Sequence, residues 1–347
     1  MVVLVGADDL RGFAREVLMK VCVPQTHADM IVDHLVLANL RGVDSHGIMR
    51  LPYYVKGIED GLINPNPNVK VVVDGDAYAL LDGDNGLGQV AATKATDTAI
   101  VKASENGIGL VGVRNLRHAG MLAYYVLRIL ESKMVGVAIA NASPNMAPLG
   151  CKKPVVGTNP LAVGFPVEGG PPVLLDMATS FAAKGKILLA AKKGEKIPEG
   201  WAADKHGRVT TDPRKAMEGT LLPIGSHKGF GLAIVIDAVC GVVFGGEYGL
   251  KIKRGRWFSQ GGFLVLALKI DAFRPYNDYL KEMREYVSAI KSAPTTEGTE
   301  ILLPGEPEAR VFQERSRKGI PLDEDVFRGL SELSKKFGVN PPKQVPP

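Results

Sequence analysis

Residues 41–50, RGVDSHGIMR, gather side chains that could bind and protonate a small anion. An arginine guanidinium binds a carboxylate through two parallel hydrogen bonds, which makes Arg50 a candidate carboxylate ligand. His46 lies four residues before it, and an imidazole can donate a proton or a hydrogen bond to a neighbouring oxygen. If a helix begins near Gly47, both side chains point to one side of its first turns. A capping turn with a surface ion pair is the competing interpretation.

A second histidine, His118, lies in the segment NLRHAGMLAYY at 115–125. The apolar run 108–113 predicts a strand before it, and 120–133 predicts a helix after it. Turns between a strand and a helix often carry binding residues. A small residue such as Gly120 lets a ligand approach the backbone, and the start of a helix favours an anion. On this motif alone, a histidine that only caps the helix fits equally well.

Three further parts of the chain could hold a nucleotide. Asp176 ends the buried run of LLDMATS, and a carboxylate there could accept hydrogen bonds from ribose hydroxyls, with a helix cap near Ser180 as the alternative. His227 and Lys228 open an apolar helix pattern, where a cation and exposed amides suit a pyrophosphate. Polar turns elsewhere could offer a hydroxyl and an amide to a ligand, although such turns are more often structural: Ser143 and Asn159.

The familiar nucleotide and metal motifs do not occur. GDNGLG at 83–88 lacks the glycine spacing of the dinucleotide fingerprint, and GSHKGFG at 225–231 is not a P-loop. The six histidines show no H-x-x-x-H spacing and the three cysteines no C-x-x-C spacing, so no metal site is predicted. The sequence therefore gives no support for a Rossmann domain.

Apolar periodicity predicts helical chain ends around a mixed centre. The expected helices at the ends are 7–21, 24–40, one that runs to about Gly61, 275–291, 307–318 and 323–337. The expected central elements are strands at 69–73, 77–82, 108–113, 134–140, 155–166, 172–175 and 262–270, and helices at 88–105, 120–133, 180–193 and 229–244. We expect an α/β fold in which residues 69–270 form a nucleotide-binding domain, while residues 1–68 pack with 271–347 as a mostly helical unit.

The composition argues against several classes of protein. Of 347 residues, 46% are hydrophobic and 23% charged, and the net charge of +5 is not clustered as nucleic-acid binding requires. No run approaches the roughly 18 apolar residues that span a membrane. Three widely spaced cysteines indicate a reducing compartment, the cytoplasm, and Cys22 and Cys240 are expected in the core.

Together these segments resemble one family, the type 2 malate/L-lactate dehydrogenases, which also includes sulfolactate and ureidoglycolate dehydrogenases and cyclic imino-acid reductases. The motifs, in chain order, are RG-x-D-SHG-x-x-R, the histidine after the central strand, SP-x-MAP-x-G, GTNP, DMATS, HKG-x-GL and PGE. The resemblance covers essentially the whole chain. It implies a non-Rossmann NAD(P)-binding α/β fold, NAD or NADP as coenzyme, and a homodimer with sites near the subunit interface.

The resemblance, together with the motifs described above, assigns roles to residues. The predicted catalytic residues are His118, as acid and base, and His46. The predicted substrate contacts are Arg50, Ser45, Tyr54 and Asn159. The predicted coenzyme contacts are Gly120, Ser143, Asp176, Met177, Ala178, His227, Lys228, Gly305 and Glu306. We assign the proton to His118 because Arg50 disfavours an imidazolium at the neighbouring His46.

The predicted reaction is hydride transfer between NAD(P)H and a small 2-keto or 2-hydroxy acid, with malate and oxaloacetate preferred. L-Lactate, sulfolactate, ureidoglycolate and cyclic imino acids are alternatives, although Lys186 stands where some imino-acid reductases have Asp, and Ala119 replaces a frequent aromatic residue. A non-catalytic dinucleotide-binding protein and a hydrolase using Ser45 or Cys151 are alternatives from other classes. Adjacent side chains such as those of Ser45 and His46 rarely form a nucleophile–base pair.

Overall fold

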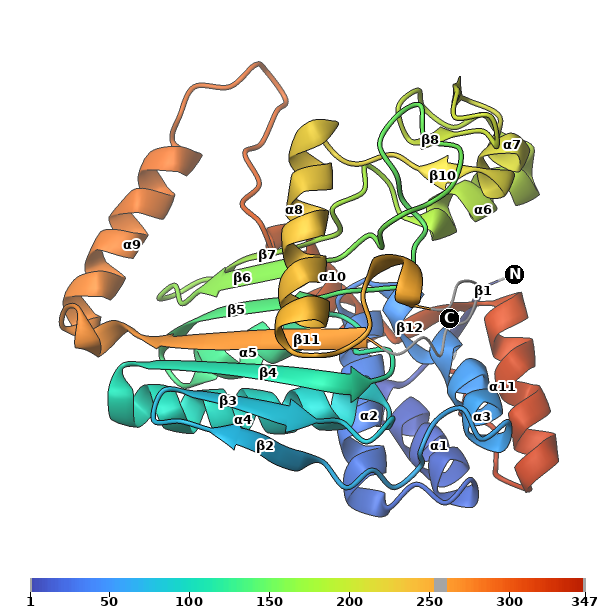
Figure 1. The fold of residues 1–347 in the computed structure, drawn as a ribbon, viewed down its shortest axis with the longest axis horizontal. Helices are drawn as coiled ribbons and strands as arrows, with labels where there is room; N and C mark the ends of the chain where they lie inside the picture. The colour runs from blue at the N-terminus through green and yellow to red at the C-terminus, as the bar shows by residue number, and fades with distance from the viewer. Residues whose placement is uncertain (1, 253–260, 346–347) are drawn as a thin grey trace.

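The computed structural model describes residues 2–252 and 261–345, and a seven-stranded sheet forms its centre (Figure 1). The strand order is β2-β3-β4-β11-β5-β6-β7, in which only β3 and β4 run parallel. The strands are β2 Lys70–Asp74, β3 Tyr78–Asp82, β4 Ile108–Leu116, β5 Met134–Ala140, β6 Leu161–Phe165, β7 Val173–Met177 and β11 Gly261–Lys269. Because a Rossmann sheet is mostly parallel, the predicted α/β fold of a different kind is confirmed.

Helices cover both faces of this sheet (Figure 1). α4 (Gly88–Asn106) and α5 (Ala123–Glu131) pack on one face, and α8 (His227–Asp237) crosses the other. The buried side of α4 consists largely of alanines at helical spacing, namely Ala91, Ala95, Ala99 and Ala103. Such small side chains let the helix lie close to β4, the strand that leads to His118.

The two ends of the chain form a second hydrophobic core. β1 (Val2–Val5) pairs antiparallel with β12 (Ile320–Asp323). The helices of this core are α1 Ala7–Lys20, α2 Gln25–Leu40, α3 Leu51–Glu59 and α11 Glu324–Phe337. α2 also contacts α4 and therefore joins this core to the sheet. The division into domains at 68/69 and 270/271 stays a prediction.

A third, smaller core contains the helix expected at 180–193 together with short elements between residues 202 and 221 that the sequence patterns did not predict. Its elements are β8 Ala202–Ala203, β9 Val209–Thr210, β10 Thr220–Leu221, α6 Lys184–Lys193 and α7 Pro213–Glu218. Two-residue strands are too short to show an alternating pattern. Two predicted elements also need correction: 155–166 is a strand only at β6, and the helix expected at 229–244 begins at His227 and ends in the π-helix η3 (Ala238–Val243).

The last long segment leaves the body of the sheet and returns to it. α9 (Tyr276–Lys291) projects outward and has no buried residue, whereas α10 (Glu306–Lys318) packs against α2 (Figure 1). Among the residues that the structure describes, no helix combines the length and apolar character needed to cross a membrane.

Candidate active site

The segment between α2 and α3 is a tight loop. It consists of two 3-10 turns, η1 (Asp44–His46) and η2 (Ile48–Arg50), and α3 begins after both of them. η2 runs directly into α3, so helical backbone does begin just after Gly47, as expected, with a 3-10 first turn. His46 lies before it in η1, so His46 and Arg50 do not share one helix.

The loop places His46 against His118. The two imidazole rings stack, with 5.4 Å between their centroids and 21° between their planes. The Tyr54 hydroxyl lies 2.7 Å from His118 Nδ1, and Gln89 Nε2 donates to the same hydroxyl oxygen at 2.8 Å. Both Tyr54 and Gln89 are buried. This chain of bonds occupies Nδ1 of His118 and leaves Nε2 outside it.

Arg50 is the last residue of the same loop and is only 5% exposed. Its Nε donates to the carbonyl oxygen of Ser45 at 2.6 Å. Burial, together with the positive charge of Arg50, lowers the pKa of His46 to about 3. Burial, then the neighbouring His46 and Arg50, holds the pKa of His118 well below its usual 6.5. Both imidazoles are therefore neutral near pH 7 before an anion binds.

Ser45 and His46 do meet, although their adjacency argued against it. Ser45 Oγ lies 2.9 Å from His46 Nδ1, because the 3-10 turn sets the two side chains next to each other. The contact occupies Nδ1 of His46 in the same way as Tyr54 occupies Nδ1 of His118. Nε2 is therefore the nitrogen of each ring that faces away from these contacts.

The turn that carries His118 is held by a buried histidine. His34 Nε2 accepts a hydrogen bond from the backbone N–H of Met121 at 2.8 Å, and burial lowers the pKa of His34 to about 4, which keeps it a neutral acceptor. Gly120 has a φ of +80°, and a Cβ there would lie 2.1 Å from His34 Cε1. α5 begins at Ala123, later than predicted, so Gly120 packs on His34 and does not start a helix.

Backbone hydrogen bonds join two motifs expected to contact coenzyme with the GTNP turn, whose Asn159 was expected to contact substrate. Thr179 N–H donates to the carbonyl oxygen of Thr158, and Ile224 N–H donates to that of Thr179, each at 2.9 Å. These bonds link DMATS to GTNP and to the turn before α8. His227 and Lys228 are exposed in the first turn of α8, and Ser143 is half-buried in the turn 141–150.

Asp176 connects the DMATS segment to the turn that carries His118. Its Oδ2 accepts from the backbone N–H of Ala123 at 2.8 Å, so it caps α5 and not the helix expected near Ser180. Although part of Asp176 is accessible to solvent, burial raises the pKa of its carboxyl to about 6. Met177 and Ala178 follow it and are half-buried. The carboxylate at the end of β7 thus bonds to the backbone five positions after His118.

Asn159 is buried, and both ends of its side-chain amide bond to the backbone. The side chain is inaccessible to solvent. Its Oδ1 accepts from the backbone N–H of Ala142 at 2.9 Å, and its Nδ2 donates to the carbonyl oxygen of Ala233 at 2.8 Å. These bonds tie the turn 141–150 to α8, a different role from the substrate contact that the sequence suggested.

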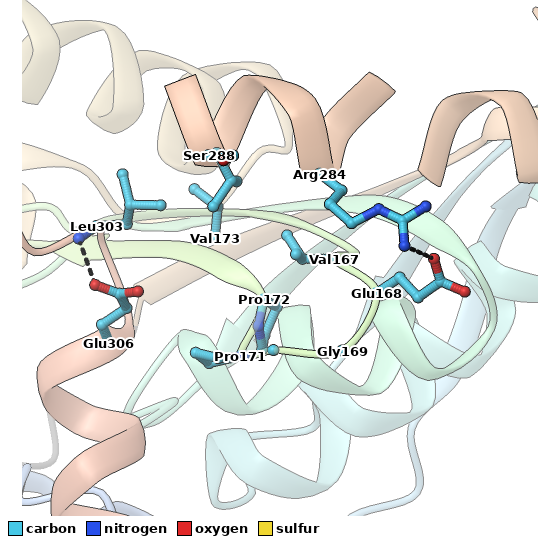
Figure 2. Close-up of a pocket in the computed structure, with 12 residues that line it drawn as sticks. Val167, Glu168, Gly169, Pro171, Pro172, Val173, Arg284, Ser288, Leu303 and Glu306 are labelled. Carbon is cyan, nitrogen blue, oxygen red and sulfur yellow. Dashed lines mark hydrogen bonds and ion pairs between the residues drawn. The ribbon is translucent and has the colours of Figure 1, made fainter. Parts of the chain in front are cut away.

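Gly305 and Glu306 begin α10 beside a cavity of about 220 Å³ between α9 and the β6–β7 turn (Figure 2). Glu306 accepts from the backbone N–H of Leu303 at 3.0 Å and from Lys291 Nζ at 2.6 Å, so its carboxylate binds its own chain. The residues lining this cavity do not include His46, Arg50 or His118. The histidine pair is therefore not part of this cavity.

Sequence reasoning missed the residues that support this site, namely Gln89, His34, Asn39 and Arg315. His34 is a core residue that holds the turn carrying His118. Gln89 had one available signal, because it is a polar residue on the buried side of α4. Arg315 had none, because its partners lie at the other end of the chain.

Comparison with known proteins identifies the fold. A family model described as malate/L-lactate dehydrogenase matches residues 5–331. Malate dehydrogenase of Pyrococcus abyssi is 38% identical over 97% of this chain and 96% of its own length. L-Sulfolactate dehydrogenase of Methanocaldococcus jannaschii is 41% identical over 94% of both chains.

Solved structures agree with these matches. Sulfolactate dehydrogenase from Methanocaldococcus jannaschii has a TM-score of 0.92 at 39% identity, covering 97% of this chain and 98% of that chain. Malate dehydrogenase from Entamoeba histolytica has a TM-score of 0.93 at 29% identity, covering 98% and 99%. The resemblance noted in the sequence is confirmed. The chain belongs to the malate/L-lactate dehydrogenase family, and it is a hydroxy acid dehydrogenase.

Proposed function

We propose that the protein interconverts a small 2-keto acid and its 2-hydroxy acid, with oxaloacetate and malate as its preferred pair. The observation that carries the proposal is a buried arginine beside two stacked histidines. Arg50 supplies a carboxylate ligand, and His118 supplies a nitrogen for the proton of the adjacent oxygen. Relatives named for malate and for sulfolactate support this substrate class.

In reduction, Arg50 holds the substrate carboxylate and His118 Nε2 gives a proton to the carbonyl oxygen. A nicotinamide coenzyme, when bound, would supply the hydride in this direction and accept it in the other. The positive charge of Arg50 lowers the pKa of His118 in the free protein. The substrate carboxylate offsets this charge, and the pKa of His118 therefore rises when substrate binds. Tyr54 fixes the ring through Nδ1, and His46 donates a further hydrogen bond to the substrate.

The residues expected to hold the coenzyme have the chemistry for a dinucleotide. Lys228, at the first turn of the eleven-residue α8, offers a cation beside a helix N-terminus. Arg41 is buried near Asp176, and within the described ranges its Nε has no hydrogen-bond partner. Exposed Lys184 and Lys186 at the start of α6 could bind a 2′-phosphate, so we propose NAD or NADP.

Lys228→Ala is expected to weaken dinucleotide binding roughly 10–100-fold, the effect of losing one hydrogen bond to a charged group. The loss should shrink at high salt, because an exposed cation is screened. Calorimetric titration with NADH and NADPH at two ionic strengths measures both effects. Lys193→Ala, an exposed lysine at the end of α6, is the matched control. Equal affinity in the two variants would remove Lys228 from the coenzyme site.

The proposed reaction is tested with a panel of oxaloacetate, pyruvate, sulfopyruvate and a cyclic imine, each with NADH and NADPH. Coenzyme absorbance reports the turnover. We expect the highest kcat/KM with oxaloacetate. A higher value with sulfopyruvate or pyruvate would reassign the substrate within the family, and binding of coenzyme without any turnover would support the non-catalytic alternative.

We further propose a homodimer that covers the apolar surface of α8 and η3. Val235 is 60% and Val243 70% exposed, and Leu232 and Val242 extend the same surface. Contiguous exposed apolar side chains mark association sites. Val235→Lys should therefore shift the protein from dimer to monomer in sedimentation velocity. Val101→Lys on α4, where valine is 57% exposed, is the matched control and should leave the dimer intact.

We place the protein in the cytoplasm. The support is its three free cysteines, which are typical of a reducing compartment. Cys240 is buried as expected. Cys22 was expected in the core but is exposed, because it follows the last turn of α1 with a φ of +64°.

A further inference from the structure

The loop that carries His46 and Arg50 has little local structure to stabilise it. Each of its two 3-10 turns is three residues long, and neither has a side-chain cap. Short 3-10 turns have poor hydrogen-bond geometry and depend on their surroundings. A site that must orient a carboxylate and a proton donor needs this loop held to within a fraction of an ångström.

The loop is held instead through Asp44 and Asn39. Asn39, at the end of α2, is 2% exposed. Its Oδ1 accepts from the backbone N–H of Ile48 at 2.7 Å, and its Nδ2 donates to Asp44 Oδ1 at 2.6 Å. A Cβ at Gly47 would lie 2.2 Å from Asn39 Oδ1, so the loop backbone packs directly on this amide. Asn39 therefore bonds to the loop on both sides of His46.

Arg315 of α10 closes the network from the far end of the chain. Its two terminal nitrogens donate to Asp44 Oδ1 at 2.7 Å and Oδ2 at 3.0 Å, and one of them also donates to the carbonyl oxygen of Asn39 at 2.6 Å. The Arg315 side chain is only 16% exposed. The Asp44 side chain is 46% exposed, but a two-pronged contact from a largely buried guanidinium fixes geometry in a way that a fully exposed, single-bonded ion pair does not.

The N-terminal end of α10 is attached to β7, the strand that leads into the DMATS segment expected to contact coenzyme. Leu174 N–H donates to the carbonyl oxygen of Pro304 at 2.9 Å. Gly305, with a φ of +91°, packs so closely on β7 that a Cβ would lie 3.1 Å from Leu174 Cβ. Glu306 and Arg315 are nine residues apart on one helix, a rise of about 14 Å. α10 thus spans from β7, which ends in Asp176 and Met177, to the substrate loop.

We infer that Arg315 is a positioning residue that sets the substrate loop through Asp44. It touches neither His46 nor Arg50, and it acts on both. Asp44 begins the turn that ends in His46, and the carbonyl of Ser45 holds Arg50 Nε. This inference rests on the proposed roles of Arg50 and His118, and it predicts a defect in substrate turnover without a defect in coenzyme binding.

The test compares Arg315→Ala, Arg315→Lys, Asp44→Ala and the Arg315→Ala/Asp44→Ala double variant. Arg317→Ala is the matched control, because that arginine is exposed on the same helix and bonds only within it, to Gln313, among the contacts described. For each protein we would measure kcat and KM for oxaloacetate, the calorimetric Kd for NADH, and the Tm.

Arg315→Ala should lose about 10–10²-fold in kcat/KM, the range expected for a displaced substrate, with the Kd for NADH unchanged. Arg315→Lys should recover part of the loss, because lysine keeps the charge but not the fork. The double variant should be no worse than the worse single variant, since both break one network. A merely structural role would instead lower the Tm and weaken NADH binding together.

Additive losses, or kinetics of Arg315→Ala equal to those of Arg317→Ala, would overturn the inference. If Arg315→Ala does not fold, Asp44→Asn decides, because it keeps the side-chain shape and removes the charge that Arg315 binds. Normal kinetics in Asp44→Asn would then count against the inference. Failure of the proposed function is a separate result, because it would show as normal turnover in variants of Arg50 and His118 themselves.

Discussion

His118→Ala is expected to lose kcat by about 10²–10⁴-fold while still binding coenzyme, the range for removal of a positioned general acid. Hydride addition to a ketone builds negative charge on oxygen, which must be met by a proton. His118 is the histidine whose Nδ1 is held by Tyr54 and whose Nε2 is left for that oxygen. Steady-state kinetics with oxaloacetate and calorimetry with NADH measure the two properties separately.

The pH dependence identifies the group. Because the pKa of His118 is lowered in the folded protein, the acid form is lost below the usual 6.5. In reduction, kcat/KM should therefore fall as pH rises through that low pKa, and in oxidation it should rise, since the neutral ring is then the base. His118→Ala should abolish this limb. If His46→Ala removes the limb and His118→Ala retains it, the two histidines have exchanged roles.

Arg50→Lys is expected to raise the activation free energy for keto acids by about 2–5 kcal/mol, which lowers kcat/KM by roughly 30–5000-fold. Coenzyme affinity should be unchanged. Lysine keeps the charge but cannot make the two parallel bonds to a carboxylate. Arg50 is also 5% exposed, so a shorter side chain leaves a space and loses the bond to the Ser45 carbonyl. The loss should therefore exceed that of an exposed ion pair.

Two controls make this result specific. Arg11→Lys changes an arginine on α1 whose ion pairs, with Asp8 and Asp33, lie in the first helices and should leave kinetics unaltered. A substrate in which the carboxylate is replaced by a carboxamide cannot use the arginine. The unmodified protein and Arg50→Lys should therefore turn it over equally poorly. Near-normal kinetics of Arg50→Lys with oxaloacetate would place the carboxylate ligand elsewhere.

Local patterns predicted the regular elements well where these elements are long. α1, α2, α4 and α9 were expected within two residues of their observed bounds, because an apolar stripe at helical spacing depends only on neighbouring residues. The pairing of β1 with β12 and the small sheet β10-β8-β9 were not predicted. Pairing depends on residues far apart in the chain, and two-residue strands show no pattern.

In the candidate site, too, some features follow from the sequence alone and others depend on folding. The sequence by itself determined the types of chemistry present, a guanidinium and two imidazoles, because these follow from covalent structure. Only the tertiary structure decided that His46 stacks on His118, that Tyr54 and Gln89 occupy one nitrogen, and which side chains are buried. Distances and pKa values depend on neighbours brought together by folding. His34 and Arg315 act across 87 and 271 residues of chain, a separation that no local motif records.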